Sequence, residues 1–148
     1  MTKNDWWTAP TVADGGKTVI VTGRRDIDKF RSKGKYKIRV EVSWVYEPDG
    51  SAGFPSLEDS KLMEEATEAF HATLKDTNVA VMTGIYTGDG RRDWVFYTMS
   101  TDAFGKFLNR ALAELPVLPL SIYAENDPDW AEYDEMKQLS EILPGDEE

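Results

Sequence analysis

The chain has 148 residues, a formal net charge of −10 and no cysteine. This length suits one domain, large enough to bury a core without a metal or a disulfide to hold it together. The absence of cysteine excludes disulfides, thiolate metal sites and cysteine nucleophiles, and the acidic balance argues against binding to nucleic acid. No apolar run approaches the roughly 20 residues of a membrane span and no signal peptide is visible, so we expect a cytoplasmic protein.

The charge is divided unevenly along the chain. Residues 1–39 hold ten Lys or Arg against four Asp or Glu, whereas residues 40–148 hold seven against twenty-three. We interpret the basic cluster between Arg24 and Arg39 as a solvated loop and strand face, with a basic binding patch as the alternative. Residues 125–148 carry ten acids and one lysine, and we expect a protein partner, if there is one, to present a basic surface to them.

The first 34 residues predict an N-terminal β-hairpin extension. Its strands, Trp6–Val12 and Lys17–Gly23, flank the turn sequence Asp14-Gly15-Gly16, in which glycine tolerates the positive φ of tight turns. One short helical turn at most follows, over the sequence DIDKF.

Residues 35–125 begin with the clearest periodicity in the chain. Hydrophobic and polar residues alternate between Lys35 and Tyr46, which predicts a strand with one buried face and one wet face. Ser56 then provides an N-cap for an amphipathic helix that Asn78 closes.

Two strands, Val79–Thr87 and Asp93–Met99, form a predicted hairpin across Gly88-Asp89-Gly90. The second strand is apolar on both faces, since it places Trp94 on one face and Tyr97 on the other. A sheet with one wet face would alternate cleanly, so we expect cover on both sides. The cover is either a second chain or one of the tryptophans Trp6, Trp7 and Trp130, and the oligomeric state stays open.

Ser100 or Thr101 caps a second helix that Pro116 stops, and an edge strand over Leu118–Ala124 follows it. The order of elements over residues 35–125 is therefore βαββαβ. This order predicts an α+β, ferredoxin-like antiparallel sheet with its helices on one face. With the hairpin and a C-terminal helix, we expect a single domain over residues 1–148.

The sequence DPDWAEY at residues 127–133 predicts that C-terminal helix, over residues 126–143, with a disordered tail over 144–148. Asp127 is a good N-cap, and Pro128 suits the first helical position. Trp130 then packs against the sheet or a neighbouring helix, with a ligand-facing or partner-facing position as the alternative.

Three short aromatic strings carry a family resemblance: SWVY at the end of the first core strand, RRDWVFYT on a later strand, and DPDWAEY. Together, over roughly residues 35–138, they resemble the bacterial family catalogued as domain of unknown function 695. That family is similar in its βαββαβ layout to the regulator of ribonuclease activity B, which inhibits an RNA-degrading enzyme. The resemblance implies a regulatory role by analogy and carries over no catalytic, cofactor or metal-binding residue.

No residue pattern predicts a catalytic centre, a cofactor or a metal site. The chain has one histidine, His71, and no phosphate-binding glycine motif. The segment Thr87–Arg92 comes nearest to an anion-binding loop, because two glycines and two guanidinium groups can grip a carboxylate or phosphate. The candidate ligand or partner contacts are Arg91, Arg92, Trp94, Tyr97, Trp130 and Tyr133.

Three functions are open on this sequence. We favour a non-catalytic regulatory or protein-interaction module, because no catalytic constellation is visible. The first alternative is a small-molecule-binding or enzymatic domain that uses the Thr87–Arg92 loop, with Arg91, Arg92 and a carboxylate converging in a deep pocket. The second is single-stranded RNA binding on an aromatic sheet face, against which the net acidity and the absence of RNA-binding glycines count.

Overall fold

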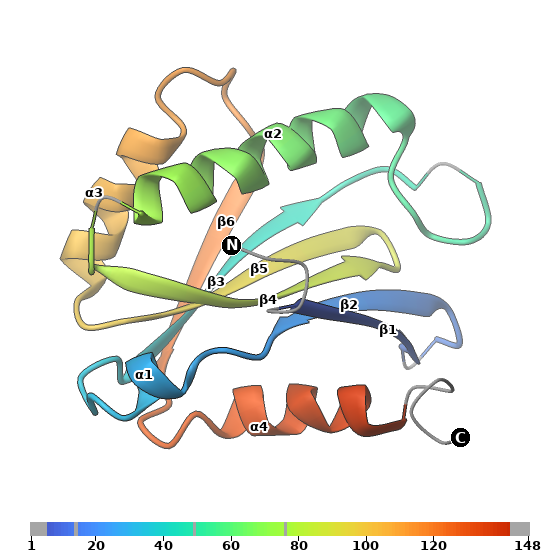
Figure 1. Ribbon diagram of the computed structural model, residues 1–148. Coiled ribbons are helices and arrows are strands. Elements are labelled where there is room, and N and C mark those ends of the chain that lie inside the picture. The colour runs from blue at the N-terminus through green and yellow to red at the C-terminus, as the bar shows by residue number, and fades with distance from the viewer. Residues whose placement is uncertain (1–5, 14, 49, 76, 143–148) are drawn as a thin grey trace.

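The computed structural model describes residues 6–13, 15–48, 50–75 and 77–142. Its elements are β1 Trp6–Val12, β2 Thr18–Arg24, α1 Asp28–Arg31, β3 Ile38–Val45, α2 Leu57–Leu74, β4 Ala80–Gly88, β5 Arg91–Thr98, α3 Thr101–Ala111, β6 Leu120–Asn126, α4 Ala131–Lys137 and the 3₁₀ helix η2 Gln138–Ile142. The strands form a six-stranded antiparallel sheet, with α2 and α3 on one face and α4 on the other (Figure 1). Among the described residues, no helix is long and apolar enough to cross a membrane.

The strand order is β1-β2-β4-β5-β3-β6, which confirms the predicted α+β class. The part from β3 to β6 has the βαββαβ element order, and its strand order is compatible with the ferredoxin-like plan. The N-terminal hairpin does not cover a sheet face. It lengthens the sheet instead, because β2 pairs with β4 and leaves β1 as one edge.

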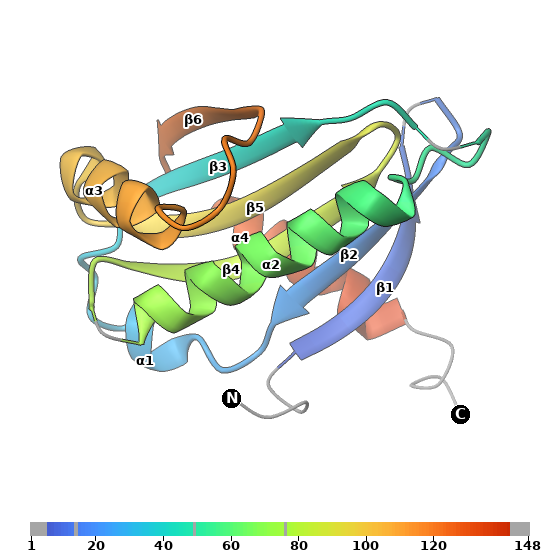
Figure 2. The same ribbon diagram turned by 90° about the horizontal axis from the view of Figure 1, so that it is seen from above.

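The larger hydrophobic core lies between the sheet and the helices α2 and α3. Seen from above, α2 crosses the β4 and β2 side of the sheet, while α3 lies toward β3 and β6 (Figure 2). Both helices have the predicted caps: the hydroxyl of Ser56 accepts a hydrogen bond from the Asp59 amide (3.1 Å), and that of Ser100 accepts one from the Ala103 amide (3.2 Å).

A second core lies on the opposite face, beneath α4. The ring of Trp130 stacks on that of Tyr97 with centroids 4.3 Å apart, and its indole N–H donates to the carbonyl of Tyr36 (2.8 Å). Tyr133 and Met136 are buried beside them. The second apolar face of β5 is therefore covered by the chain's own C-terminal helix, and Trp130 packs against the sheet as predicted.

The start of α4 differs from the prediction. The N-cap residue is Trp130 and not Asp127, and the helix begins at Ala131 and not at Pro128. The carboxylate of Asp127 still accepts hydrogen bonds from the amides of Ala131 (2.9 Å) and Glu132 (3.2 Å). The intervening turn ends with Trp130 in the left-handed region, at φ 58°. This conformation is uncommon for a bulky residue, and the burial of the indole ring holds it in place. The predicted tail lies outside the described residues.

The acidic C-terminal segment forms ion pairs with the basic N-terminal third of the same chain. Arg31 donates two hydrogen bonds of 2.7 Å to the carboxylate of Asp134, across 103 positions of the chain. Arg39 contacts Glu125 (2.6 Å) and lies 3.5 Å from Asp127. Some of the charges that are divided unevenly along the sequence therefore pair with one another, and these pairs hold α4 and β6 against their neighbours.

A bulge in β4 decides which side chains face α2. The β4–β5 register shifts between Met82 and Gly84, so Thr83 is an extra residue in the strand. The alternation reverses after it, and Thr87 lines a pocket on the α2 face while Tyr86 packs into the α4 core. Sequence periodicity alone did not predict this reversal.

Candidate functional site

A pocket of about 630 Å³ lies between α2 and the strands β2, β4 and β5. We call it the Arg92 pocket, after the one arginine among its lining residues. It is lined by Trp6, Ile20, Thr22, Phe54, Pro55, Ser60, Glu64, Thr67, His71, Ile85, Thr87 and Arg92.

Arg92 supplies a half-buried positive charge to this pocket. It lies opposite Thr87 in the β4–β5 ladder, and its Nε donates to the Thr87 hydroxyl (2.9 Å). Its guanidinium carbon lies 5.7 Å from the ring centroid of Trp94. Among the described residues, no carboxylate oxygen comes within 4.0 Å of its nitrogens. Burial lowers the pKa of Arg92, and the negative charge of Glu64 acts in the opposite direction.

The pair of Trp6 and His71 forms one side of the pocket. The two rings meet edge to face, with centroids 5.6 Å apart. Burial lowers the pKa of His71, and the positive charges of Arg24 and Lys75 lower it further. The imidazole is therefore neutral at neutral pH, and it offers hydrogen-bonding groups without adding charge.

The loop before α2 brings Phe54 and Pro55 to the pocket. Two hydrogen bonds hold this loop in place at Gly53. Its carbonyl accepts them from the hydroxyl of Tyr46 (2.7 Å) and the amide of Gly90 (2.9 Å). Gly53 has φ of +89°, and a Cβ there would come within 3.0 Å of the Asp89 amide nitrogen. The loop therefore has a fixed approach to the β4–β5 turn, and the apolar wall that it carries is preformed.

Arg91 and Arg92 do not converge. They are neighbours on one strand, so their side chains leave opposite faces of the sheet. Arg91 is half exposed and donates to the carboxylate of Asp93 (2.8 Å), away from the Arg92 pocket. The Thr87–Arg92 segment thus gives the pocket its two end residues, while its glycines form only the turn between the strands.

The four aromatic candidates lie inside the protein. Trp94 is fully buried under α2, where its indole N–H donates to the Thr67 hydroxyl (2.9 Å). Tyr97, Trp130 and Tyr133 belong to the core beneath α4 and are at most 2% exposed. In this arrangement they serve packing, and an RNA base has no access to Tyr97 because Trp130 already stacks on it.

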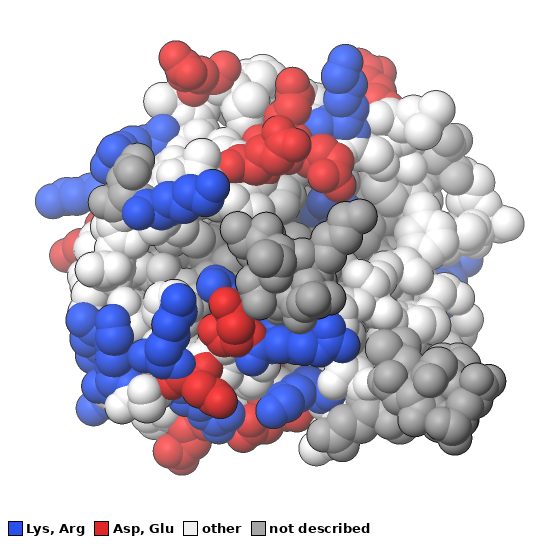
Figure 3. Space-filling model, in the orientation of Figure 1, with Lys and Arg blue, Asp and Glu red and all other residues white. Residues whose placement is uncertain are grey.

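A second pocket, of about 720 Å³, shares His71 with the first and contains part of the basic cluster. Lys and Arg side chains gather around α1 with acids among them (Figure 3). Within this pocket Arg24 is paired with Asp26, at 2.7 Å. The positive charge of the basic cluster is therefore partly neutralised here. This agrees with its interpretation as a solvated surface and not as a binding patch.

The Arg92 pocket supplies binding groups and no visible catalytic pair. Among the described residues, His71 makes no hydrogen bond to a hydroxyl group, and the hydroxyl of Thr67 already bonds Met63 and Trp94. The same residues contain no group of three or more His, Cys, Asp or Glu placed to hold a metal ion.

Sequence reasoning found Arg92 but missed most of the side chains around it. Trp6, Glu64 and His71 come from distant elements, and no local pattern joins them. The sequence named Thr87 as one end of the Thr87–Arg92 segment but not the direction of its side chain. A signal for that direction was Gly84, because an isolated glycine inside a strand often marks a bulge.

A comparison with known protein families shows to which family the chain belongs. The model of the family described as "Family of unknown function (DUF695)" matches residues 4–136. The chain belongs to this family. The match begins at residue 4, so the family unit includes the N-terminal hairpin, which the resemblance seen in the sequence did not cover. No curated protein and no solved structure gives a match, and the similarity to the regulator of ribonuclease activity B stays an expectation.

Proposed function

We propose that the protein is a non-catalytic binding module that takes up a small organic anion with an apolar body in the Arg92 pocket. The observation that carries the proposal is the half-buried guanidinium of Arg92, which meets no carboxylate among the described residues. Removing such a charge from water is costly, so an anion that pairs with it gains a strong hydrogen-bonded contact. A bacterial, cytoplasmic and regulatory setting, expected from the sequence, is part of the same proposal.

The walls of the pocket favour a ligand with an apolar body. Four large hydrophobic side chains line it, from four different segments: Trp6, Ile20, Phe54 and Ile85. Its volume of about 630 Å³ lies within the range of small-molecule sites, roughly 300–1,000 Å³. A few polar groups in a mainly apolar concavity are the usual composition of a site that binds and orients a ligand.

The proposal is tested by titrating the ¹⁵N-labelled protein with small carboxylates, some of which also carry an amino group, and with their uncharged amides. At least one carboxylate is expected to shift the amide resonances of pocket residues, while its amide does so much more weakly. In Arg92→Gln the affinity for that carboxylate should fall about tenfold or more, because a charge-assisted contact is lost.

Arg91→Gln is the matched control, since Arg91 is the neighbouring arginine on the other sheet face. It should bind the carboxylate like the wild-type protein. The proposal is wrong if no carboxylate in the panel binds, or if Arg92→Gln binds as tightly as the wild type.

A second candidate function, protein interaction, is favoured by the exposed edge strand β6. Within the described part of the chain only β3 pairs with it, and Ile122 and Tyr123 are 55% and 52% exposed. The opposite edge strand, β1, carries Pro10 in its middle, which removes one amide donor, whereas β6 contains neither proline nor lysine. An edge strand without such residues can pair with the same strand of a second copy of the chain, around a two-fold axis.

Self-association through β6 is tested by sedimentation velocity over a range of concentrations. The wild-type protein should form a dimer that Ile122→Lys weakens, because a charge then lies in the strand pairing. Val117→Lys changes a fully exposed residue outside the strand and should leave the dimer intact. A wild-type protein that sediments as a monomer at every concentration would exclude this second function.

A further inference from the structure

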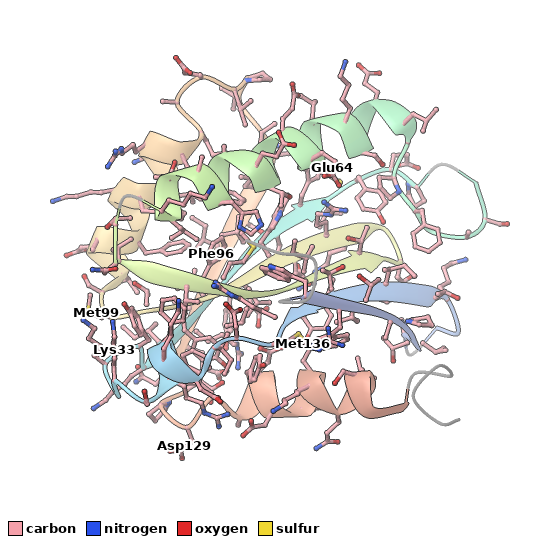
Figure 4. All side chains as sticks on the ribbon, in the orientation of Figure 1. Lys33, Glu64, Phe96, Met99, Asp129 and Met136 are labelled. Carbon is pink, nitrogen blue, oxygen red and sulfur yellow. The ribbon has the colours of Figure 1, made fainter. Side chains whose placement is uncertain are left out.

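The Arg92 pocket holds two opposite charges that do not pair with each other. Arg92 comes from β5, and Glu64 is an exposed residue of α2 that lines the pocket (Figure 4). Their side chains are not within the 4.0 Å of an ion pair, although the charge of Glu64 acts on Arg92. A cation and an anion thus line one pocket from two different elements.

We propose that the ligand is a small zwitterion, an α-amino acid with a large apolar side chain. Its carboxylate binds the guanidinium of Arg92, its ammonium group binds the carboxylate of Glu64, and its side chain lies against Trp6, Phe54 and Ile85. This inference rests on the proposed function and adds the second charge to it.

The hydrogen bond of Arg92 to Thr87 uses Nε and leaves the two terminal nitrogens of the guanidinium for a carboxylate. Nε is engaged by the Thr87 hydroxyl, and the ring of Trp94 lies near the guanidinium carbon. The two terminal nitrogens make no hydrogen bond among the described residues, and together they can hold both oxygens of a carboxylate. Thr87 thereby fixes the direction from which the carboxylate approaches.

Glu64 makes a simple anion a poorer ligand than a zwitterion. A carboxylate bound at Arg92 would also lie in the field of Glu64, whose repulsion offsets part of the attraction to Arg92. An ammonium group on the same ligand turns that repulsion into a second attractive contact. His71 is neutral at neutral pH, so it adds no positive charge that would repel this ammonium group.

The inference is tested by calorimetry and ¹⁵N NMR titration with two sets of matched probes. One set is L-phenylalanine, 3-phenylpropanoate and 2-phenylethylamine; the other is L-leucine, 4-methylpentanoate and 3-methylbutylamine. Within at least one set, the amino acid should bind about tenfold more tightly than the acid or the amine, because it alone makes both charged contacts.

Two variants measure the contributions of Glu64 and Arg92 separately. Glu64→Gln should weaken the amino acid about tenfold and leave the acid unchanged or slightly tighter, whereas Arg92→Gln should weaken both. Arg92→Lys, which keeps the charge, should bind more tightly than Arg92→Gln and so show that the loss is electrostatic. Glu65→Gln is the control, since Glu65 is exposed on α2 and does not line the pocket.

The outcomes distinguish this inference from the proposed function. If the acids bind the wild type as tightly as the amino acids and Glu64→Gln has no effect, the zwitterion inference is overturned and the anion-binding function stands. If none of the six probes shifts a pocket resonance in the wild type, the zwitterion inference is overturned. Tighter binding by the amines than by the amino acids overturns it as well, since Arg92 would then contribute nothing.

Discussion

At the scale of single residues, Glu132 is the group whose position is least expected for its charge. It lies on the inner side of α4, where the Tyr86 hydroxyl donates to one carboxylate oxygen, and the other oxygen is buried with no partner among the described residues. Burial raises its pKa, although the hydrogen bond from Tyr86 opposes this shift. Its charged form is therefore destabilising in the folded protein.

We predict that Glu132→Gln stabilises the protein at neutral pH by about 1 kcal/mol, because glutamine keeps the contact with Tyr86 and carries no charge. A carboxyl group with a raised folded pKa binds its proton more tightly when folded. The wild type therefore loses stability as the pH rises from the unfolded pKa, about 4.3, through the higher folded value. The gain in the variant should vanish near pH 4.

Urea unfolding of both proteins across this pH range measures the effect. Glu135→Gln, an exposed position on the same helix, controls for the general loss of a negative charge and should change stability little at any pH. A Glu132→Gln variant that is destabilised at neutral pH would mean that the ionised carboxylate has a favourable partner after all.

At the scale of elements, local patterns predicted which segments are helices and strands but not which way the side chains point. In β3 the alternation correctly placed Val40, Val42 and Trp44 on a buried face. The predicted wet face was wrong, because on that face Ser43 is buried and Arg39 and Glu41 are half-buried. In β4 the bulge at Thr83 reverses the faces, so Tyr86 lies near Glu132 and Thr87 reaches Arg92. Alternation of hydrophobic and polar residues does not reveal one extra residue in a strand. The only local sign of the bulge is the glycine at position 84.

The start of α4 was missed for a related reason. Asp127 and Pro128 have the right residue types for a helix start, and the Asp127 carboxylate does bond the first helical amides, but Trp130 is the N-cap residue. The helix begins three residues later than Pro128 because burial of the Trp130 ring against Tyr97 imposes a left-handed conformation just before it. That contact joins residues distant in the sequence, and no local propensity contains it.

At the scale of the whole molecule, the sequence predicted the order of elements and left the second sheet face undecided. The order follows from periodicity and turn residues, which are local. What covers the β5 face depends on where α4 docks, and the described structure assigns this role to Trp130 and the residues around it. The candidate site was only partly predictable for the same reason, since Trp6, Glu64 and Arg92 meet only in the fold.

Attraction between the basic N-terminal third and the acidic C-terminal segment is a property of the whole chain that can be measured. Arg31 and Asp134 form a two-contact ion pair at 2.7 Å, with their side chains 34% and 52% exposed. We predict a coupling free energy of about 0.5–1 kcal/mol in a double-mutant cycle with Arg31→Ala and Asp134→Ala, because exposed pairs are screened by water. The coupling should decrease as salt is added.

The single variants alone would not isolate this term, because Arg31 also donates to the backbone carbonyl of Asp129 (2.7 Å) and lies over the Trp130 ring. Arg31→Ala should therefore cost more than Asp134→Ala. A second cycle, with Asp129→Ala in place of Asp134→Ala, is the control, since Arg31 contacts the carbonyl of Asp129 and not its carboxylate. That cycle should show almost no coupling. Equal coupling in both cycles, or none in the first at low salt, would mean that the ion pair between Arg31 and Asp134 does not help to dock α4 onto the sheet.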